Sequence, residues 1–110
     1  MVFAGQRGPE AIPVNYAMLG SDVVVRTGQR TSLTDRAAQT RVSFEVDHLD
    51  RALAEGWSVL ASGLAQVVTV PSELETVCSL GLEPWAGGEK DTYLRITITD
   101  ITGRRIRASR

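Results

Sequence analysis

The sequence is short of the residues from which metal centres and many catalytic sites are built. Its 110 residues include one cysteine, Cys78, and one histidine, His48. A disulfide within the chain is therefore excluded, and no cysteine cluster is present to hold zinc or an iron–sulfur group. We expect no metal site. We interpret Cys78, which lies between Val77 and Leu80, as a packed helical thiol, and His48 as a surface residue.

Several classes of function are excluded by other absences. No apolar run approaches the length of a membrane span, and the first five residues lack the basic and apolar regions of a signal peptide. The glycine-flanked serine of hydrolases and the lysine of a phosphate-binding loop are also missing. A net charge of -1 argues against nucleic acid or an anionic membrane as a partner. We expect a single cytoplasmic domain over residues 1–110.

The apolar residues that are present mostly alternate with polar ones, and many are β-branched, which predicts a mainly β fold with one or two short helices. We expect strands over 11–18, 22–27, 41–47, 57–70 and 94–99. Leu19-Gly20-Ser21 has hairpin length and joins the first two. From Arg41 to Asp47 the apolar residues share one face, whereas Glu45 and Asp47 lie on the other as solvated carboxylates without an acid–base role.

The predicted strand from Trp57 to Val70 is unusual because both of its faces are apolar. Such a strand in a small domain indicates a bent barrel strand whose outer face is covered by a helix or a partner chain. Gly63 is the expected bend, and Gly103 is the expected bulge in the last strand. Ser72 and Glu75 have the spacing of a capping box at the start of a short helix, which Gly81 ends.

The segment from Arg26 to Leu33 has the composition of an anion site, with two arginines and three hydroxyl side chains between an apolar strand and a helix signal at Ser32 and Asp35. A helix amino end and guanidinium groups suit a phosphate. A polar, solvated turn explains the same residues. Pro13 lacks a backbone donor, which predicts a sheet edge or an irregularity that leaves neighbouring polar groups available to a ligand.

Seven ordered segments together resemble the pyridoxamine 5'-phosphate oxidase-like flavin-binding family, in particular its small actinobacterial members. They are Pro13-Val14-Asn15-Tyr16, Val25-Arg26-Thr27-Gly28, Thr31-Ser32-Leu33, Val42-Ser43-Phe44-Glu45-Val46-Asp47, Gly56-Trp57-Ser58-Val59, Pro84-Trp85 and Ile101-Thr102-Gly103-Arg104. The resemblance spans nearly the whole chain. It implies a split β-barrel homodimer with FMN bound at the subunit interface.

The resemblance also implies the cofactor-binding residues. Arg26, Thr27, Thr31, Ser32 and Leu33 fall where relatives hold the flavin phosphate and ribityl chain, and Pro13, Val14, Asn15 and Tyr16 fall along the isoalloxazine ring. Trp57, Ser58 and Trp85 fall in the pocket wall or the dimer seam. Relatives commonly carry a lysine at Ser32, and Arg30 is the expected replacement for its charge. Many relatives also carry an opening helix before the segment that matches Met1 to Gly5.

The function implied by the resemblance is an FMN-dependent oxidoreductase that acts on a small organic substrate by hydride or electron transfer. The sequence identifies no catalytic residue and no particular substrate. A reductase that uses a deazaflavin, a flavin-binding protein without catalysis, and a purely structural dimer module are the alternatives. We expect no contact with nucleic acid or membrane.

Overall fold

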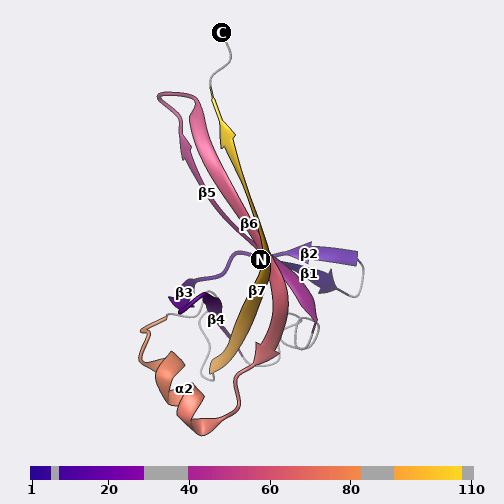
Figure 1. Ribbon diagram of the computed structural model, residues 1–110, viewed down its shortest axis with the longest axis vertical. Helices are drawn as coiled ribbons and strands as arrows, with labels where there is room; N and C mark the ends of the chain where they lie inside the picture. Colours follow the sequence, from indigo (N-terminus) through magenta and orange to yellow (C-terminus); the bar gives the residue numbers. More distant parts are fainter. Residues whose placement is uncertain (6–7, 29–39, 83–90, 108–110) are drawn as a thin grey trace.

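The computed structural model of the chain describes residues 1–5, 8–28, 40–82 and 91–107. These residues form one antiparallel sheet of 7 strands in the order β2-β1-β5-β6-β7-β4-β3 (Figure 1). The strands are β1 (Val2–Gly5), β2 (Gly8–Ala11), β3 (Tyr16–Leu19), β4 (Asp22–Gly28), β5 (Arg41–Asp50), β6 (Glu55–Val67) and β7 (Asp91–Ile106). The described part also contains helix α2 (Pro71–Cys78). The predicted mainly β fold is confirmed.

One face of the sheet, called the inner face below, carries the main core. Val42 and Phe44 of β5 are buried on it, and Val46 is half-buried, as the alternation in this segment predicts. Leu94 and Ile96 of β7 lie fully buried in the same core. β3 and β5 are not neighbours in the sheet, yet the rings of Tyr16 and Phe44 touch with centroids 4.8 Å apart. The sheet is therefore curled around this core.

The opposite, outer face is covered in part by α2. Val24 and Tyr93 on the outer face pack with Val77 of the helix, and Val68 and Leu82 complete this second core. Arg95 fixes the helix to the sheet, because its guanidinium donates to Asp22 of β4 at 2.7 Å and to Glu73 of α2 at 3.1 Å.

The sheet changes register where β6 pairs with β7. Ser62 pairs with Asp100 and Gly63 with Ile98, so Thr99 is the extra residue of a bulge. The register shift lies next to Gly63, the residue at which the sequence predicts a bend. The predicted bulge at Gly103 is wrong, because Gly103 pairs regularly with Val59. Thr99 donates to the Ser62 carbonyl oxygen at 3.3 Å, so polar contacts hold the bulge in place.

Beyond this bulge, three strands continue away from the rest of the molecule. We call this part the arm; it comprises residues 45–50 of β5, 55–61 of β6 and 100–106 of β7, and it forms the upper part of Figure 1. We call the other described residues, apart from the 51–54 turn and Arg107, the body. The arm makes the molecule elongated, with extents of 54 × 33 × 28 Å. A turn over residues 51–54 joins β5 to β6, and Asp50 accepts a hydrogen bond from the Leu53 amide at 3.2 Å.

Three sequence predictions about local structure need correction. Residues 11–18 do not form one strand, because residues 12–15, which connect β2 to β3, belong to neither strand; this irregular segment contains Pro13, as its missing donor predicts. The strand predicted to reach Val70 ends at Val67, three residues short. The helix begins at Pro71 with Val70 as its N-cap and no side-chain cap, so a first-turn proline replaces the expected capping box at Ser72.

At the C-terminal end of α2, the prediction for Gly81 is confirmed and the prediction for Cys78 is wrong. Gly81 has a φ of 72°, the left-handed conformation that favours glycine after a helix, as predicted. Cys78 is exposed rather than packed. Val77 takes the buried position in the last turn, so Cys78, one residue later, is turned toward solvent.

Candidate functional site

The first group of sequence-predicted residues lies where residues 12–15 lead into β3. Pro13 and Asn15 are exposed, whereas Val14 packs against the main core. Tyr16 is 42% exposed and Met18 is 51% exposed, and both lie on the inner-face side because they pair with Val25 and Val23. The edge of the Phe44 ring supports Tyr16 at an interplanar angle of 66°. The result is an open apolar wall with one phenol group.

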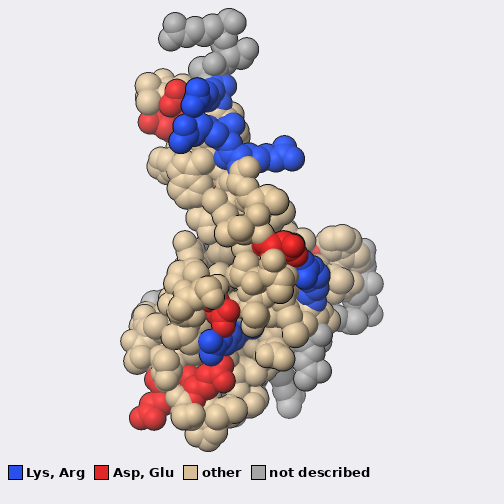
Figure 2. All heavy atoms as spheres, in the orientation of Figure 1, with Lys and Arg blue, Asp and Glu red and all other residues tan. Residues whose placement is uncertain are grey.

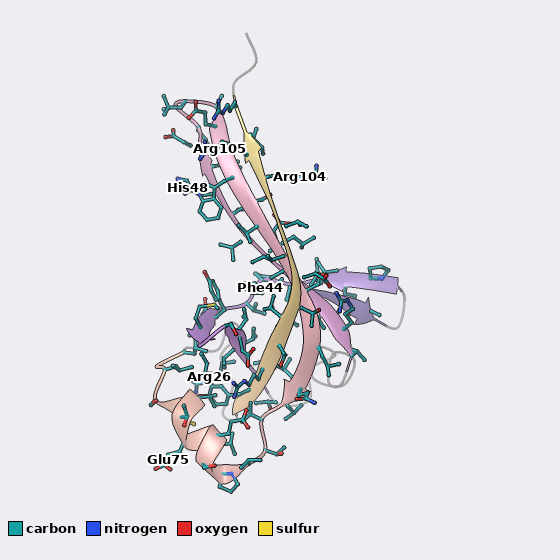
Figure 3. All side chains as sticks on the ribbon, viewed as in Figure 1. Arg26, Phe44, His48, Glu75, Arg104 and Arg105 are labelled. Atoms are coloured by element: carbon teal, nitrogen blue, oxygen red, sulfur yellow. The ribbon has the colours of Figure 1, made fainter. Side chains whose placement is uncertain are left out.

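Arg26 and Thr27, which the sequence predicts as neighbours in a phosphate site, point to opposite faces of β4. Thr27 follows Val25 onto the inner face and is buried. Arg26 follows Val24 onto the outer face, where it donates to the Leu82 carbonyl oxygen and lies 5.9 Å from the centroid of the Tyr93 ring. The guanidinium therefore joins the end of β4 to the chain that follows α2, and it lies low in the body in Figure 3. Tyr16 and Arg26 are separated by the thickness of the sheet.

The remaining residues of the predicted phosphate segment are Arg30, Thr31, Ser32 and Leu33, and they lie outside the described residues, as does Trp85. The predicted helix start at Ser32 and Asp35 also lies outside them.

Trp57 and Ser58 belong to the arm. They are consecutive in β6, so their side chains point to opposite faces. Trp57 pairs with Arg105 on β7, whereas Arg26 pairs with Tyr93 near the other end of the same strand. About 40 Å of extended strand separates those two positions of β7. Trp57 and Arg26 thus lie far apart and on different faces within one chain.

The arm also groups Trp57, which the resemblance places in the pocket wall or the dimer seam, with residues that have no predicted role in the site. Strand register places His48, Trp57 and Arg105 side by side on the inner face, with the His48 and Trp57 rings 6.2 Å apart and inclined at 32°. Figure 3 shows His48 and Arg105 together high on the arm. The sequence could have indicated the His48–Trp57 pair, because a turn over residues 51–54 places His48 opposite Trp57.

Both faces of the arm expose apolar side chains, among them Ile101 on the inner face, which is 68% exposed. The outer face exposes Leu49, Leu60 and Ile106, and Leu64 continues this face just outside the arm; each is between 41% and 63% exposed. At its tip the inner face bears the His48–Trp57 pair among charged side chains. Figure 2 shows acidic and basic groups gathered at the end of the arm. The arm is thus a three-stranded sheet with apolar side chains exposed to solvent, as the two apolar faces of β6 predict.

Two absences are limited to the described part of the chain. There, no cluster of histidine, cysteine, aspartate or glutamate side chains is suited to a metal ion. Nor does the described part include a helix of the length and apolarity that crossing a membrane requires.

The sequence profile of the pyridoxamine 5'-phosphate oxidase family matches residues 1–105. The chain belongs to this family. The resemblance drawn from the short motifs is therefore confirmed, and it covers the body and the arm alike.

Comparisons with individual proteins and solved structures agree with this assignment. The uncharacterized protein Rv3129 of Mycobacterium tuberculosis is 35% identical over 88 residues, which cover 80% of this chain and 78% of that protein. The structure of the FAD binding protein from Mycobacterium smegmatis superimposes with a TM-score of 0.81 at 29% identity, over 97% of this chain and 82% of the other. A conserved protein of unknown function from Corynebacterium diphtheriae gives a TM-score of 0.76 at 30% identity, with the same coverage of both chains. The predicted split-barrel fold is confirmed.

Proposed function

We propose that this protein is a flavin-binding oxidoreductase that uses FMN to act on a small organic substrate by hydride or electron transfer. Its membership of the pyridoxamine 5'-phosphate oxidase family and its likeness to an FAD binding protein support a flavin as cofactor. The observation that carries the proposal is the open apolar wall formed by Tyr16, Met18 and Phe44.

The wall fits the ring system of a flavin. A planar, largely apolar ring needs aromatic or apolar side chains against its face and a few polar groups at its edge. Tyr16 offers both, because its ring packs against Phe44, it carries a phenol hydroxyl group, and the residue is 42% exposed. We assign the ring to this wall, and the phosphate to Thr27 and the segment that follows it. We assign to Arg26 the role of a positioning residue, which holds the end of β4 through Leu82.

We further propose that the site is completed by a second copy of the chain. The exposed leucines on the outer face of the arm are an apolar surface of the kind that marks an interface between subunits. A homodimer in which this face rests on the body of the partner would bring Ser58 of the arm to the partner's flavin. One chain could not do this for its own phosphate segment, because Arg26 and the arm lie toward opposite ends of β7.

The bound flavin would supply the redox chemistry by accepting and donating a hydride. The task of the protein is then to orient the ring, to exclude water and to admit a small substrate. Tyr16 and Met18 bind and orient the ring, and the arm of the partner closes the site.

The proposal is tested by titrating the purified chain with FMN, FAD and a deazaflavin side by side while recording the visible absorbance and the mass in solution. We expect one FMN per chain, a shifted flavin spectrum and a dimer. Failure of all three cofactors to saturate the protein would overturn the proposal and favour a structural module. Saturation without oxidation of a reduced nicotinamide faster than free FMN would favour a flavin-binding protein without catalysis.

A further inference from the structure

The tip of the arm carries a pocket that the proposed flavin site does not use. Its volume is about 430 Å³, within the range of roughly 300–1,000 Å³ that is typical of small-molecule sites. It is lined by His48, Asp50, Glu55, Gly56, Trp57, Arg105, Ile106 and Arg107. All eight residues come from one chain.

The pocket has an aromatic floor. The His48 and Trp57 rings lie 6.2 Å apart, and Trp57 is 44% exposed, so part of its side chain is accessible to a ligand. Register places Arg105 beside Trp57 on the same face. Aromatic side chains flanked by arginine are suited to stack a planar base.

The charges of the pocket are divided between its two sides. Asp50 and Glu55 are paired at the end of the β5–β6 hairpin, whereas Arg105 is the last residue but one of β7 and Arg107 directly follows that strand. In Figure 2 the acidic and basic groups stand side by side at the end of the arm. Neither Arg105 nor Arg107 forms an ion pair with another residue in the described part of the chain. Both guanidinium groups are therefore available to an anion.

We propose that this pocket binds an aminopurine nucleotide. The purine stacks on the Trp57 ring, its exocyclic amino group donates to the carboxylates of Asp50 and Glu55, and its phosphate contacts Arg105 and Arg107. Each part of the ligand lies against side chains that can bind it, because arginine forms strong hydrogen bonds with phosphate and a carboxylate accepts a hydrogen bond from an amino group. The nucleotide is either free AMP or the adenylate half of a dinucleotide such as NADH or FAD.

The test is a fluorescence titration with AMP, in a chain that carries Trp85→Phe so that Trp57 is the only tryptophan. We expect saturable quenching with a dissociation constant of roughly 0.1–1 mM, as suits an open site. IMP is the matched ligand, because it carries a carbonyl group where AMP carries the amino group. It should bind at least about fivefold more weakly, since its carbonyl oxygen meets the two carboxylates.

Two arginine variants supply the matched protein control. Arg105→Ala should weaken AMP binding about five- to tenfold. Arg104→Ala removes the same charge one residue away but from the opposite face, and it should leave AMP binding within about twofold. Arg104 and Arg105 are both exposed, so circular dichroism should show that the two variants stay folded.

Competition identifies the source of the nucleotide. Displacement of AMP by NADH or FAD, but not by FMN, supports the adenylate half of a dinucleotide. If neither NADH nor FAD displaces AMP, the ligand is free AMP. The proposal is overturned if AMP produces no quenching up to about 5 mM. Equal binding of AMP and IMP, or equal losses in the Arg104 and Arg105 variants, would also overturn it. Because the AMP and IMP titrations contain no flavin, their outcome is independent of the proposed flavin site.

Discussion

Replacing Arg26 by alanine should destabilise the protein more than it weakens flavin binding. The guanidinium donates to the Leu82 carbonyl oxygen and lies 5.9 Å from the Tyr93 ring. A hydrogen bond from a charged group contributes about 1.5–3 kcal/mol, and a cation–π contact about 0.5–1 kcal/mol. We expect a combined loss of about 2–3 kcal/mol after solvent screening, which for a chain of this size lowers the midpoint of thermal unfolding by roughly 8–12 °C.

The assay is urea unfolding of the wild-type and Arg26→Ala chains, with FMN binding measured separately at a temperature at which both are folded. Because Arg26 points to the outer face and Tyr16 to the inner face, the dissociation constant of FMN should rise by less than about threefold. Unchanged stability together with a loss of FMN affinity of more than about tenfold would refute this reasoning, and Arg26 would then be a direct ligand of the phosphate.

Three further predictions concern Arg95, Gly63 and Leu60. Arg95→Ala should cost about 1–2 kcal/mol by loss of the links to Asp22 and Glu73, whereas Arg41→Ala, which removes a more exposed pair with Asp100, should cost about 0.5 kcal/mol or less. Hydrogen bonds to Asp22, and then to Glu73, raise the pKa of Arg95, so its contribution to stability is lost only at strongly alkaline pH. The destabilisation caused by Arg95→Ala should therefore be equal at about pH 6 and pH 9, and a difference would contradict the role assigned to these two hydrogen bonds. Gly63→Ala should cost more than about 2 kcal/mol because the new Cβ would meet the Thr97 carbonyl oxygen, whereas Gly103→Ala, whose Cβ would lie 3.6 Å from the Ser58 carbonyl oxygen, should stay within about 0.5 kcal/mol in the same urea assay. Leu60→Ser should shift the dimer toward monomer in sedimentation without lowering monomer stability, whereas Val70→Ser, at an exposed apolar residue outside the arm, should leave the mass unchanged; a fully dimeric Leu60 variant would contradict the proposed interface.

Local periodicity predicted most of the strands, because each residue of a strand is buried or exposed according to the face on which it lies. In β5 the alternation of Val42, Phe44 and Val46 with polar residues matches the two faces of the strand. The two apolar faces of β6 correctly indicated an unusual strand, and Gly63 marked its irregularity. The errors fell where two local signals competed. Pro71 rather than Ser72 determined the start of the helix, and the extra residue of the bulge was Thr99, which no glycine or proline marks.

The candidate site was less accessible to sequence reasoning than the fold. In the sequence, adjacent residues such as Arg26 and Thr27 look like parts of one motif, and so do Trp57 and Ser58. In a strand, however, adjacent side chains point to opposite faces. The pairing of His48, Trp57 and Arg105 depends on strand register over residues that are far apart in the sequence. Recognition of the family supplied what periodicity could not, namely the curled topology that brings Tyr16 onto Phe44.

The central claim is that each flavin is held by the body of one chain and the arm of another, and mixing two defective chains tests it most directly. One chain carries Tyr16→Ala in the body, and the other carries Ser58→Trp, which blocks the arm. Each variant alone should fail to bind FMN. After unfolding and refolding together, the mixed dimer should bind FMN at one of its two sites, because one intact body then faces one intact arm. If the mixture binds no more FMN than the separate variants, although mixed dimers are detected by mass, the flavin site does not combine two chains.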